Sequence, residues 1–364
     1  MRDPGAPMTD RLRDYDIVVV GAGPAGSSAA LAAASQGLRV LVVDRKPVPG
    51  VPVRCAEHIP ALLLAEIPCA PDFIVQPVTG MRTFLPDGQV TETRAPGYII
   101  ARDRFDQALL KAAATAGADV RTGMRAVAAL PDGVVLRRHR DAAVTVHTRI
   151  IIGADGPRST VGRWIDSVNT HLVPALQVRV PLCQPLTVTE IFFERDFFGA
   201  YGWLFPRGRY ANVGLGRCPT AAAYPSLAES LRGLVGRLAD AGKIKAEPVQ
   251  RHFGWIPAEK LRPVTAGNIL LAGDAAGQTH AISGAGVPQA VICGRMAGQW
   301  AARAVKENDL DLLQQYETEW RDLFADTLTR AQEKRQLLET RWADLNEIIR
   351  SCWIAYRSYY APAS

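Results

Sequence analysis

Hydrophobic positions near the start of the chain form two short continuous runs separated by a segment of small residues. The runs DIVVV (16–20) and RVLVVD (39–44) are typical of parallel strands that are buried on both faces. Between them lies SSAALAAASQG, which predicts a helix because Ala is the strongest helix former. The order strand, helix, strand predicts a βαβ unit at the N-terminal end of the chain.

The segment GAGPAG joins the first predicted strand to the helix and places Gly21, Gly23 and Gly26 in a G-x-G-x-x-G pattern. The first glycine allows a tight turn, the second lets the backbone approach a pyrophosphate, and the third allows close helix–strand packing. The N–H groups at the start of the helix then face the phosphates. Asp44 ends the second strand, where it can bind a ribose hydroxyl. The unit predicts a dinucleotide site without choosing between FAD and NAD.

Two later stretches repeat the pattern of an apolar strand followed by polar residues. Residues 99–120 predict a strand, an amphipathic helix that begins near Arg102, and a further strand. Residues 149–163 predict a strand that ends near Asp155. Asp155 has the alternative role of a turn residue, and Arg102 that of a solvated surface charge.

A third such stretch contains GDAAGQTHAISGAG (273–286), two Gly-containing clusters around one Asp and one His. The preceding apolar run predicts a strand that delivers Asp274 to its carboxyl end. Ligands of doubly wound sheets bind at that edge, so Asp274 is expected to face the nucleotide.

Composition narrows the class of protein. The 364 residues are 48% hydrophobic and 21% charged, which is typical of a globular protein with room for two lobes. The formal charge of +6 favours an anionic substrate, cofactor or lipid surface, or else serves solubility. No run of five basic residues and no helix-turn-helix or zinc pattern occurs, so we expect no nucleic-acid partner.

The cysteines and the apolar runs bear on the compartment. The six cysteines are scattered without a C-x-x-C pair, so we expect neither disulfides nor a metal site, and a reducing compartment. The polar opening lacks a signal-peptide core, and no apolar run approaches the roughly 20 residues of a membrane span. We therefore expect a cytoplasmic protein, at most peripheral at the inner face of the membrane.

The glycine motif, the RDRFD block (102–106) and the GDAA block (273–276) together resemble the FAD-binding motifs of one flavoprotein superfamily, that of para-hydroxybenzoate hydroxylase and the geranylgeranyl reductases. The resemblance runs from about residue 14 to about residue 305. It implies FAD as cofactor and a helix N-terminus that stabilises the charge of reduced flavin. The implied cofactor-binding residues are Gly21, Gly23, Ala25, Gly26, Asp44, Arg45, Arg102, Asp155, Gly156, Asp274, Gly284, Ala285 and Gly286.

Two further blocks resemble the reductase branch. PGVPVRCAEHIP (49–60) is similar to its Cys-Gly-Glu block, with Ala56 in place of Gly, and implies that Cys55 lies near the flavin. His58 is not part of that pattern, and we place it on the substrate side. The alternative for Cys55 is a small buried apolar residue.

The second block is YGWLFP (201–206), which resembles the Y-x-W-x-F-P block of the branch. Tyr201, Trp203 and Phe205 are expected to form an apolar wall on an antiparallel sheet above the flavin. Aromatic residues at this spacing are also typical of an ordinary sheet core.

The sequence departs from the family pattern at Ala281, where a Pro is usual. The adjacent His280 is expected close to the flavin, where it donates a proton or positions a polar substrate. The alternative is a hydrogen-bonded structural histidine.

We therefore expect an α/β fold with three parts. A Rossmann-like FAD-binding domain comprises residues 14–80, 99–165 and 262–306. An inserted antiparallel-sheet substrate domain comprises 81–98 and 166–261, and a helical region comprises 307–364. Its aromatic-rich end covers the substrate cavity, contacts a membrane or partner, or packs on the core.

The predicted function is that of an FAD-dependent oxidoreductase that reduces a carbon–carbon double bond of an apolar, isoprenoid-type substrate. The predicted catalytic residues are Cys55 and His280. No second G-x-G-x-x-G unit is visible, so NAD(P)H visits transiently or a redox protein supplies electrons. The alternatives are a monooxygenase acting on an aromatic molecule or a protein side chain, and a flavoprotein assembly factor.

Overall fold

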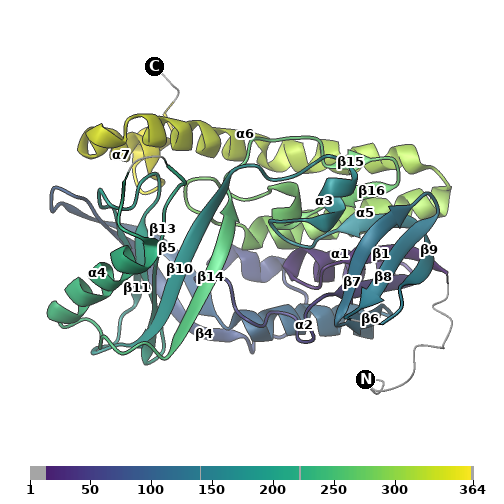
Figure 1. The fold of residues 1–364 in the computed structure, drawn as a ribbon, viewed down its shortest axis with the longest axis horizontal. Coiled ribbons are helices and arrows are strands. Elements are labelled where there is room, and N and C mark those ends of the chain that lie inside the picture. The colour runs from purple at the N-terminus through teal and green to yellow at the C-terminus, as the bar shows by residue number, and fades with distance from the viewer. Residues whose placement is uncertain (1–13, 140, 221–222, 362–364) are drawn as a thin grey trace.

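The computed structural model describes residues 14–139, 141–220 and 223–361, which form two large sheets joined by helices (Figure 1). The first sheet has a parallel core in the order β16–β9–β1–β2–β6. These strands are Ile269–Leu271, Val144–Gly153, Tyr15–Val20, Val40–Asp44 and Asp119–Thr122. The short β15 (Thr265–Ala266) and the hairpin β7 (Met124–Leu130) and β8 (Gly133–Arg138) extend it by antiparallel pairing. The predicted βαβ unit is present, with the apolar residues of β1 buried.

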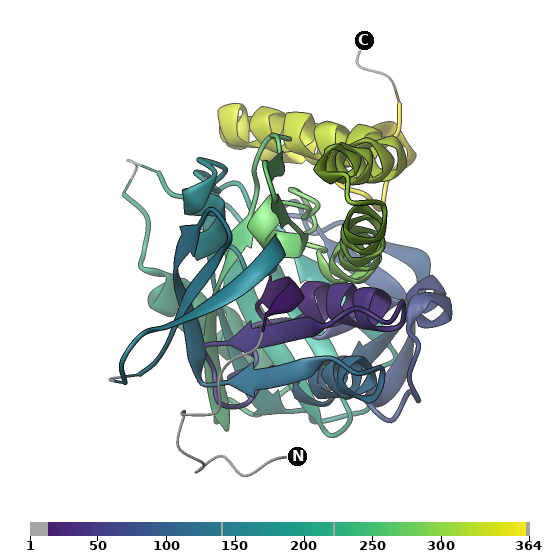
Figure 2. The ribbon, with the colours of Figure 1, turned by 90° about the vertical axis from the view of Figure 1, so that its right-hand side faces the viewer.

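Helices α1 (Pro24–Ala34) and α5 (Val287–Glu307) pack on this sheet, with α6 (Leu313–Thr340) outside α5 (Figure 2). Small residues let α1 and α5 approach closely. A Cβ at Gly294 would lie 2.3 Å from the Ala25 carbonyl oxygen, and one at Gly298 would lie 2.1 Å from that of Ala29. The remaining elements of this half are α2 (Arg102–Thr115), α3 (Thr160–Trp164) and the short η2 (Gly273–Ala276).

The second sheet has the order β14–β10–β13–β12–β11–β4–β5–β3 and is antiparallel except where β4 pairs with β11. In that order the strands are Gln250–Pro257, Leu172–Pro181, Tyr210–Gly216, Gly202–Arg207, Val188–Phe192, Ile74–Phe84, Val90–Ile100 and His58–Pro60. Helix α4 (Leu227–Asp240), which a Ser226–Glu229 capping box begins, packs its apolar face on β10 and β13.

The boundary expected at residue 81 does not fit the strand pairing. β4 is continuous through it, and β4 and β5 form one long hairpin in the second sheet. Because a continuous strand cannot be divided between two sheets, the segment from β3 to β5 belongs with the second sheet.

The C-terminal region joins the two halves. Tyr316 and Trp320 of α6 pack into the core of the first sheet, whereas Leu338 packs into an aromatic core beside the second. The chain continues through η4 (Trp342–Asp344), α7 (Leu345–Cys352) and η5 (Arg357–Tyr359). No helix in the described ranges is long and apolar enough to cross a membrane.

Candidate active site

The glycine loop between β1 and α1 has the geometry of a phosphate site. Gly21 has a φ of +107°, and a Cβ there would lie 2.2 Å from the Ala154 carbonyl oxygen. A Cβ at Gly26 would lie 1.8 Å from the Gly21 oxygen. Gly23, the N-cap of α1, faces open space and makes no side-chain cap bond. The first N–H groups of α1 are therefore accessible to an anion.

Two carboxylates stand at the carboxyl ends of strands near this loop. Asp44 Oδ2 accepts the Ala22 N–H at 2.8 Å, so its orientation is fixed. Asp274 is half-buried, desolvation raises the pKa of its carboxyl, and Oδ1 accepts the Thr279 hydroxyl at 2.9 Å. A Cβ at Gly286, the N-cap of α5, would lie 3.2 Å from Asp274 Oδ1. Asp274 and the start of α5 therefore line one site.

Arg102, at the start of α2, is held by Asp106 through Nε (2.9 Å) and Nη2 (3.1 Å). Burial lowers the pKa of Arg102, the negative charge of Asp106 raises it, and the net effect is a rise. Its positive charge also lowers the pKa of the Asp274 carboxyl, an effect smaller than the opposing effect of burial. The predicted surface-charge alternative for Arg102 does not fit this setting.

These features fit FAD. A pyrophosphate needs free N–H groups and an approach without side chains, and Gly23 supplies both. The uncapped start of α5, where Gly284 has a φ of +66°, offers further N–H groups. When bound there, FAD supplies the hydride chemistry of its flavin ring.

Cys55 is half-buried, and its Sγ accepts the Glu57 N–H at 3.3 Å while the Arg102 guanidinium interacts with it. Its carbonyl oxygen accepts Gln177 Nε2 at 3.2 Å. The Glu57 N–H and the positive charge of Arg102 therefore both act on this thiol. The structure places Cys55 in the electrostatic surroundings of Arg102, whose charge also reaches Asp274.

Glu57 is the residue that sequence reasoning underestimated. It is fully buried with a φ of +73°, and its Oε1 accepts the Arg102 N–H. Its Oε2 accepts Arg179 Nη2 at 2.8 Å, Arg207 Nε at 2.8 Å and Asn212 Nδ2 at 2.9 Å. A pattern in the sequence could have indicated a buried partner for these arginines. In LQVRV of β10 the polar residues Gln177 and Arg179 alternate with apolar ones, which predicts that one face of this strand is polar.

Tyr201, Trp203 and Phe205, the residues of the expected aromatic wall, lie on and beside β12 in or against a buried aromatic cluster. Trp203 Nε1 donates to Gln177 Oε1 at 2.9 Å, and the Tyr201 hydroxyl donates to the Ser283 carbonyl of the flavin-side loop. Phe205 contacts the half-buried His58 edge-on at 5.9 Å, and burial lowers the pKa of His58 to about 4.

The C-terminal segment completes this wall. The buried Trp353 lies 5.1 Å from both Phe193 and Tyr201, measured between ring centroids, and its Nε1 donates to Thr83 Oγ1. Of the alternatives for the aromatic tail, the structure shows packing on the core. No motif in the tail predicted this contact.

His280 is buried with both ring nitrogens engaged. Nδ1 accepts the Ser283 N–H at 3.1 Å, so the neutral ring carries its proton on Nε2, which faces the Tyr359 hydroxyl at 3.1 Å. Burial, and secondarily Arg335, lower the pKa of His280 to about 4. This geometry favours a positioning role over proton donation.

The other expected cofactor residues differ in setting. Both carboxylate oxygens of Asp155 accept bonds from the start of α3, as in the turn alternative, while its main chain packs on Gly21. Gly156 has a φ of +87° and faces open space. The remaining three are Ala25, which packs against α5, Ala285, whose oxygen accepts the His280 N–H, and Arg45, which is exposed.

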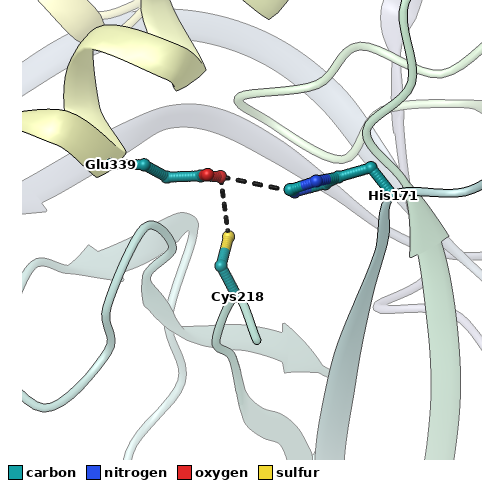
Figure 3. Close-up of side chains that lie close together, drawn as sticks. All are labelled: His171, Cys218 and Glu339. Atoms are coloured by element: carbon teal, nitrogen blue, oxygen red, sulfur yellow. Dashed lines mark hydrogen bonds and ion pairs between the residues drawn. The ribbon is translucent and has the colours of Figure 1, made fainter. Parts of the chain in front are cut away.

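A separate cluster joins His171, Cys218 and Glu339, whose ligand atoms lie within 4.8 Å of one another (Figure 3). Arg335 occupies this cluster, with Nη1 2.7 Å from Cys218 Sγ and 3.3 Å from Glu339 Oε1. Burial raises the pKa of the Cys218 thiol to about 12, which disfavours a thiolate ligand. Arg335 Nε also donates to the Ala281 carbonyl, so the cluster fastens α6 to the loop that carries His280.

Two family models match the chain. Residues 16–50 match the FAD dependent oxidoreductase model, and residues 87–331 match the FAD binding domain model. A digeranylgeranylglycerophospholipid reductase from Methanopyrus kandleri is 36% identical and aligns over 92% of this chain and 93% of its own length. Another, from Methanocaldococcus jannaschii, is 32% identical over 89% and 87%.

Comparison with solved structures gives the same family. The chain is similar to a geranylgeranyl bacteriochlorophyll reductase-like protein from Thermoplasma acidophilum, with a TM-score of 0.82 and 29% identity over 92% of both chains. A flavin-dependent brominase has a TM-score of 0.71 at 17% identity over 94% of this chain and 96% of its own, which is a likeness of fold alone.

Proposed function

Because the chain belongs to the FAD-dependent geranylgeranyl reductase family, we propose that it reduces carbon–carbon double bonds in the isoprenoid chains of a glycerophospholipid. The chain is an FAD-dependent oxidoreductase, and its curated relatives named above are digeranylgeranylglycerophospholipid reductases. The flavin-dependent brominase named above resembles it only in fold.

The observation that carries the proposal is the place of the Cys55 thiol. Its Sγ accepts the Glu57 N–H, the charge of Arg102 acts on both this thiol and Asp274 of the candidate FAD site, and Gln177 links the Cys55 carbonyl to Trp203. When bound and reduced, FAD would supply the hydride for one carbon of a double bond, and the other carbon would need a proton from the protein. Cys55 is the group that we assign to deliver that proton.

The neighbours of Cys55 suit this task. The Arg102 guanidinium and the Glu57 N–H stabilise the thiolate that remains after proton transfer, which lowers the cost of the step. Glu57 holds the turn by binding Arg179 and Arg207, and so fixes the direction of the thiol.

The aromatic wall and His280 have supporting roles in this proposal. Tyr201, Trp203 and Phe205 offer an apolar surface to a hydrocarbon chain and, with His58, form the substrate side. His280 acts as a positioning residue, because its ring holds Tyr359 and the loop of Ser283 rather than presenting a free proton.

Electrons reach FAD from NAD(P)H or from a redox protein. The substrate is collected at the inner face of a membrane by peripheral contact, which exposed Val51 and Leu62 on either side of the Cys55–His58 segment support.

The test is anaerobic turnover. FAD-loaded protein reduced with dithionite is mixed with digeranylgeranylglycerophospholipid, and the products are measured by mass spectrometry. A gain of two hydrogens per double bond, with reoxidation of the flavin, is expected. Gain of an oxygen atom when air is admitted, with no hydrogen gain before, would establish the monooxygenase alternative. Co-purification with one partner and no turnover with any donor would establish the assembly factor.

A further inference from the structure

An arginine-lined cavity of about 700 Å³ lies at the carboxyl ends of β2 and β6, next to Asp44. A volume of this size is typical of a small-molecule site. Five arginines line it: Arg45, Arg121, Arg125, Arg137 and Arg138.

The strand order places these arginines at the nucleotide-binding edge. Arg45 follows Asp44, the last residue of β2. β6 runs parallel to β2, so that Thr122 at its end is paired with Asp44, and the Gly123 N–H donates to the Lys46 carbonyl at 3.1 Å. β7 begins and β8 ends at this same edge.

The arginines repel one another as they stand. Arg125 and Arg137 are directly opposite on β7 and β8, an arrangement that is destabilising for like charges. Among the described residues, neither they nor Arg45 form an ion pair with a carboxylate. Arg121 pairs with Asp119 at 3.1 Å, yet its buried Nε has no described hydrogen-bond partner.

FAD does not supply the missing anion. Its only charged part is the pyrophosphate, which the glycine loop at Gly21–Gly26 receives. The oxygens of Asp44 accept the N–H groups of Ala22 and Lys46, and among the described residues no ion pair joins this carboxylate to Arg45, Arg125 or Arg137. A single guanidinium can bind a phosphate group through two parallel hydrogen bonds. Several arginines around one cavity therefore favour a phosphorylated ligand.

We propose that this cavity binds the phosphorylated adenosine end of NADPH, with Arg125 and Arg137 on either side of its 2′-phosphate. The inference rests on the proposed function, in which FAD must be reduced. A redox protein would instead dock near the flavin ring, at the Cys55 end. NADPH gives a hydride to FAD and leaves as NADP⁺. The hydride and the proton from Cys55 saturate the double bond, and water reprotonates the thiol, so each bond consumes one NADPH and one proton.

The experiment measures binding to the FAD-loaded protein by calorimetry. Adenosine 2′,5′-bisphosphate is compared with ADP and with inorganic phosphate, and the variants R125Q and R137Q are compared with R232Q, an exposed arginine on α4. We expect the 2′-phosphate to tighten binding about tenfold, and either cavity variant to abolish this preference. In steady state the same variants should raise the KM for NADPH about tenfold with kcat retained, whereas R232Q changes neither.

Three results would overturn the inference: equal affinity for the two nucleotides, phosphate binding as tight as nucleotide binding, or release of FAD on titration, which would make the cavity part of the FAD site. Flavin absorbance and dithionite-driven lipid reduction are measured on each variant. If dithionite-driven reduction persists without any preference for the 2′-phosphate, only this inference fails. If the unaltered protein reduces no lipid with dithionite, the proposed function fails.

Discussion

The two ends of the candidate FAD site are built from different kinds of contact. At the phosphate end, the site consists of glycines and backbone N–H groups, chiefly in the stretch from Gly21 to Gly26, with further N–H groups at the start of α5. At the Cys55 end, one buried carboxylate receives side chains from residues 122 to 155 positions away. The phosphate end tolerates side-chain changes except at glycines where no Cβ fits. The structure of the Cys55 end depends instead on the balance of charge around Glu57.

The largest effect is expected from E57Q, which removes the charge that balances Arg179 and Arg207. An uncompensated buried ion costs about 3–5 kcal/mol, and the Cys55 turn should lose its orientation. Thermal and urea unfolding, with lipid turnover, measure both effects. The control is E92Q in the exposed Arg82–Glu92 pair, where we expect less than about 1 kcal/mol. Similar losses in both variants would contradict the role of Glu57.

C55A tests whether the same end carries the chemistry. Loss of a proton donor should lower turnover about a hundredfold or more while FAD stays bound, because the phosphate end is untouched. The exposed Cys183 gives the control C183A, which should turn over normally. A C55A enzyme with full turnover would remove Cys55 from the mechanism.

Acid pH should weaken the Cys55 end through its buried histidines. Burial lowers the pKa of His280 from 6.5 to about 4, so between these values the unfolded chain binds a proton that the folded chain does not. Stability is therefore complete above pH 6.5 and falls toward pH 4, by roughly 3 kcal/mol for this residue. Urea unfolding of H280N at several pH values should show a free energy of unfolding that falls less steeply toward pH 4. The same is expected of H58N, because burial also lowers the pKa of His58. Curves parallel to that of the unaltered protein would contradict this.

G294A tests the phosphate end, where a Cβ would meet the Ala25 backbone. We expect a loss of about 1–3 kcal/mol and weaker FAD binding, because α1 must shift. G236A on α4 is the matched control: a Cβ there meets nothing within 4 Å, so the gain in helix propensity should stabilise by about 0.5–1 kcal/mol. Equal effects of the two changes would refute close packing as the determinant.

The same contrast explains what could be predicted from the sequence. The unit from β1 to β2 carries its signal locally, in apolar runs and glycine spacing, and so do β5–α2–β6 and the hairpin β12–β13. The partners of Glu57 and the Tyr359–His280 pair are contacts between distant segments, which no local pattern encodes. The boundary near residue 81 was wrong for a related reason, since sheet membership depends on strand pairing rather than on strand propensity.

The 28-residue helix α6 has a mechanical consequence. At about 42 Å it acts as a strap whose start packs into the core of the first sheet and whose end packs beside the second. A hinge between the sheets would have to bend this helix or pull Arg335 away from Ala281. Packing at both ends of α6 therefore resists rotation of one sheet against the other.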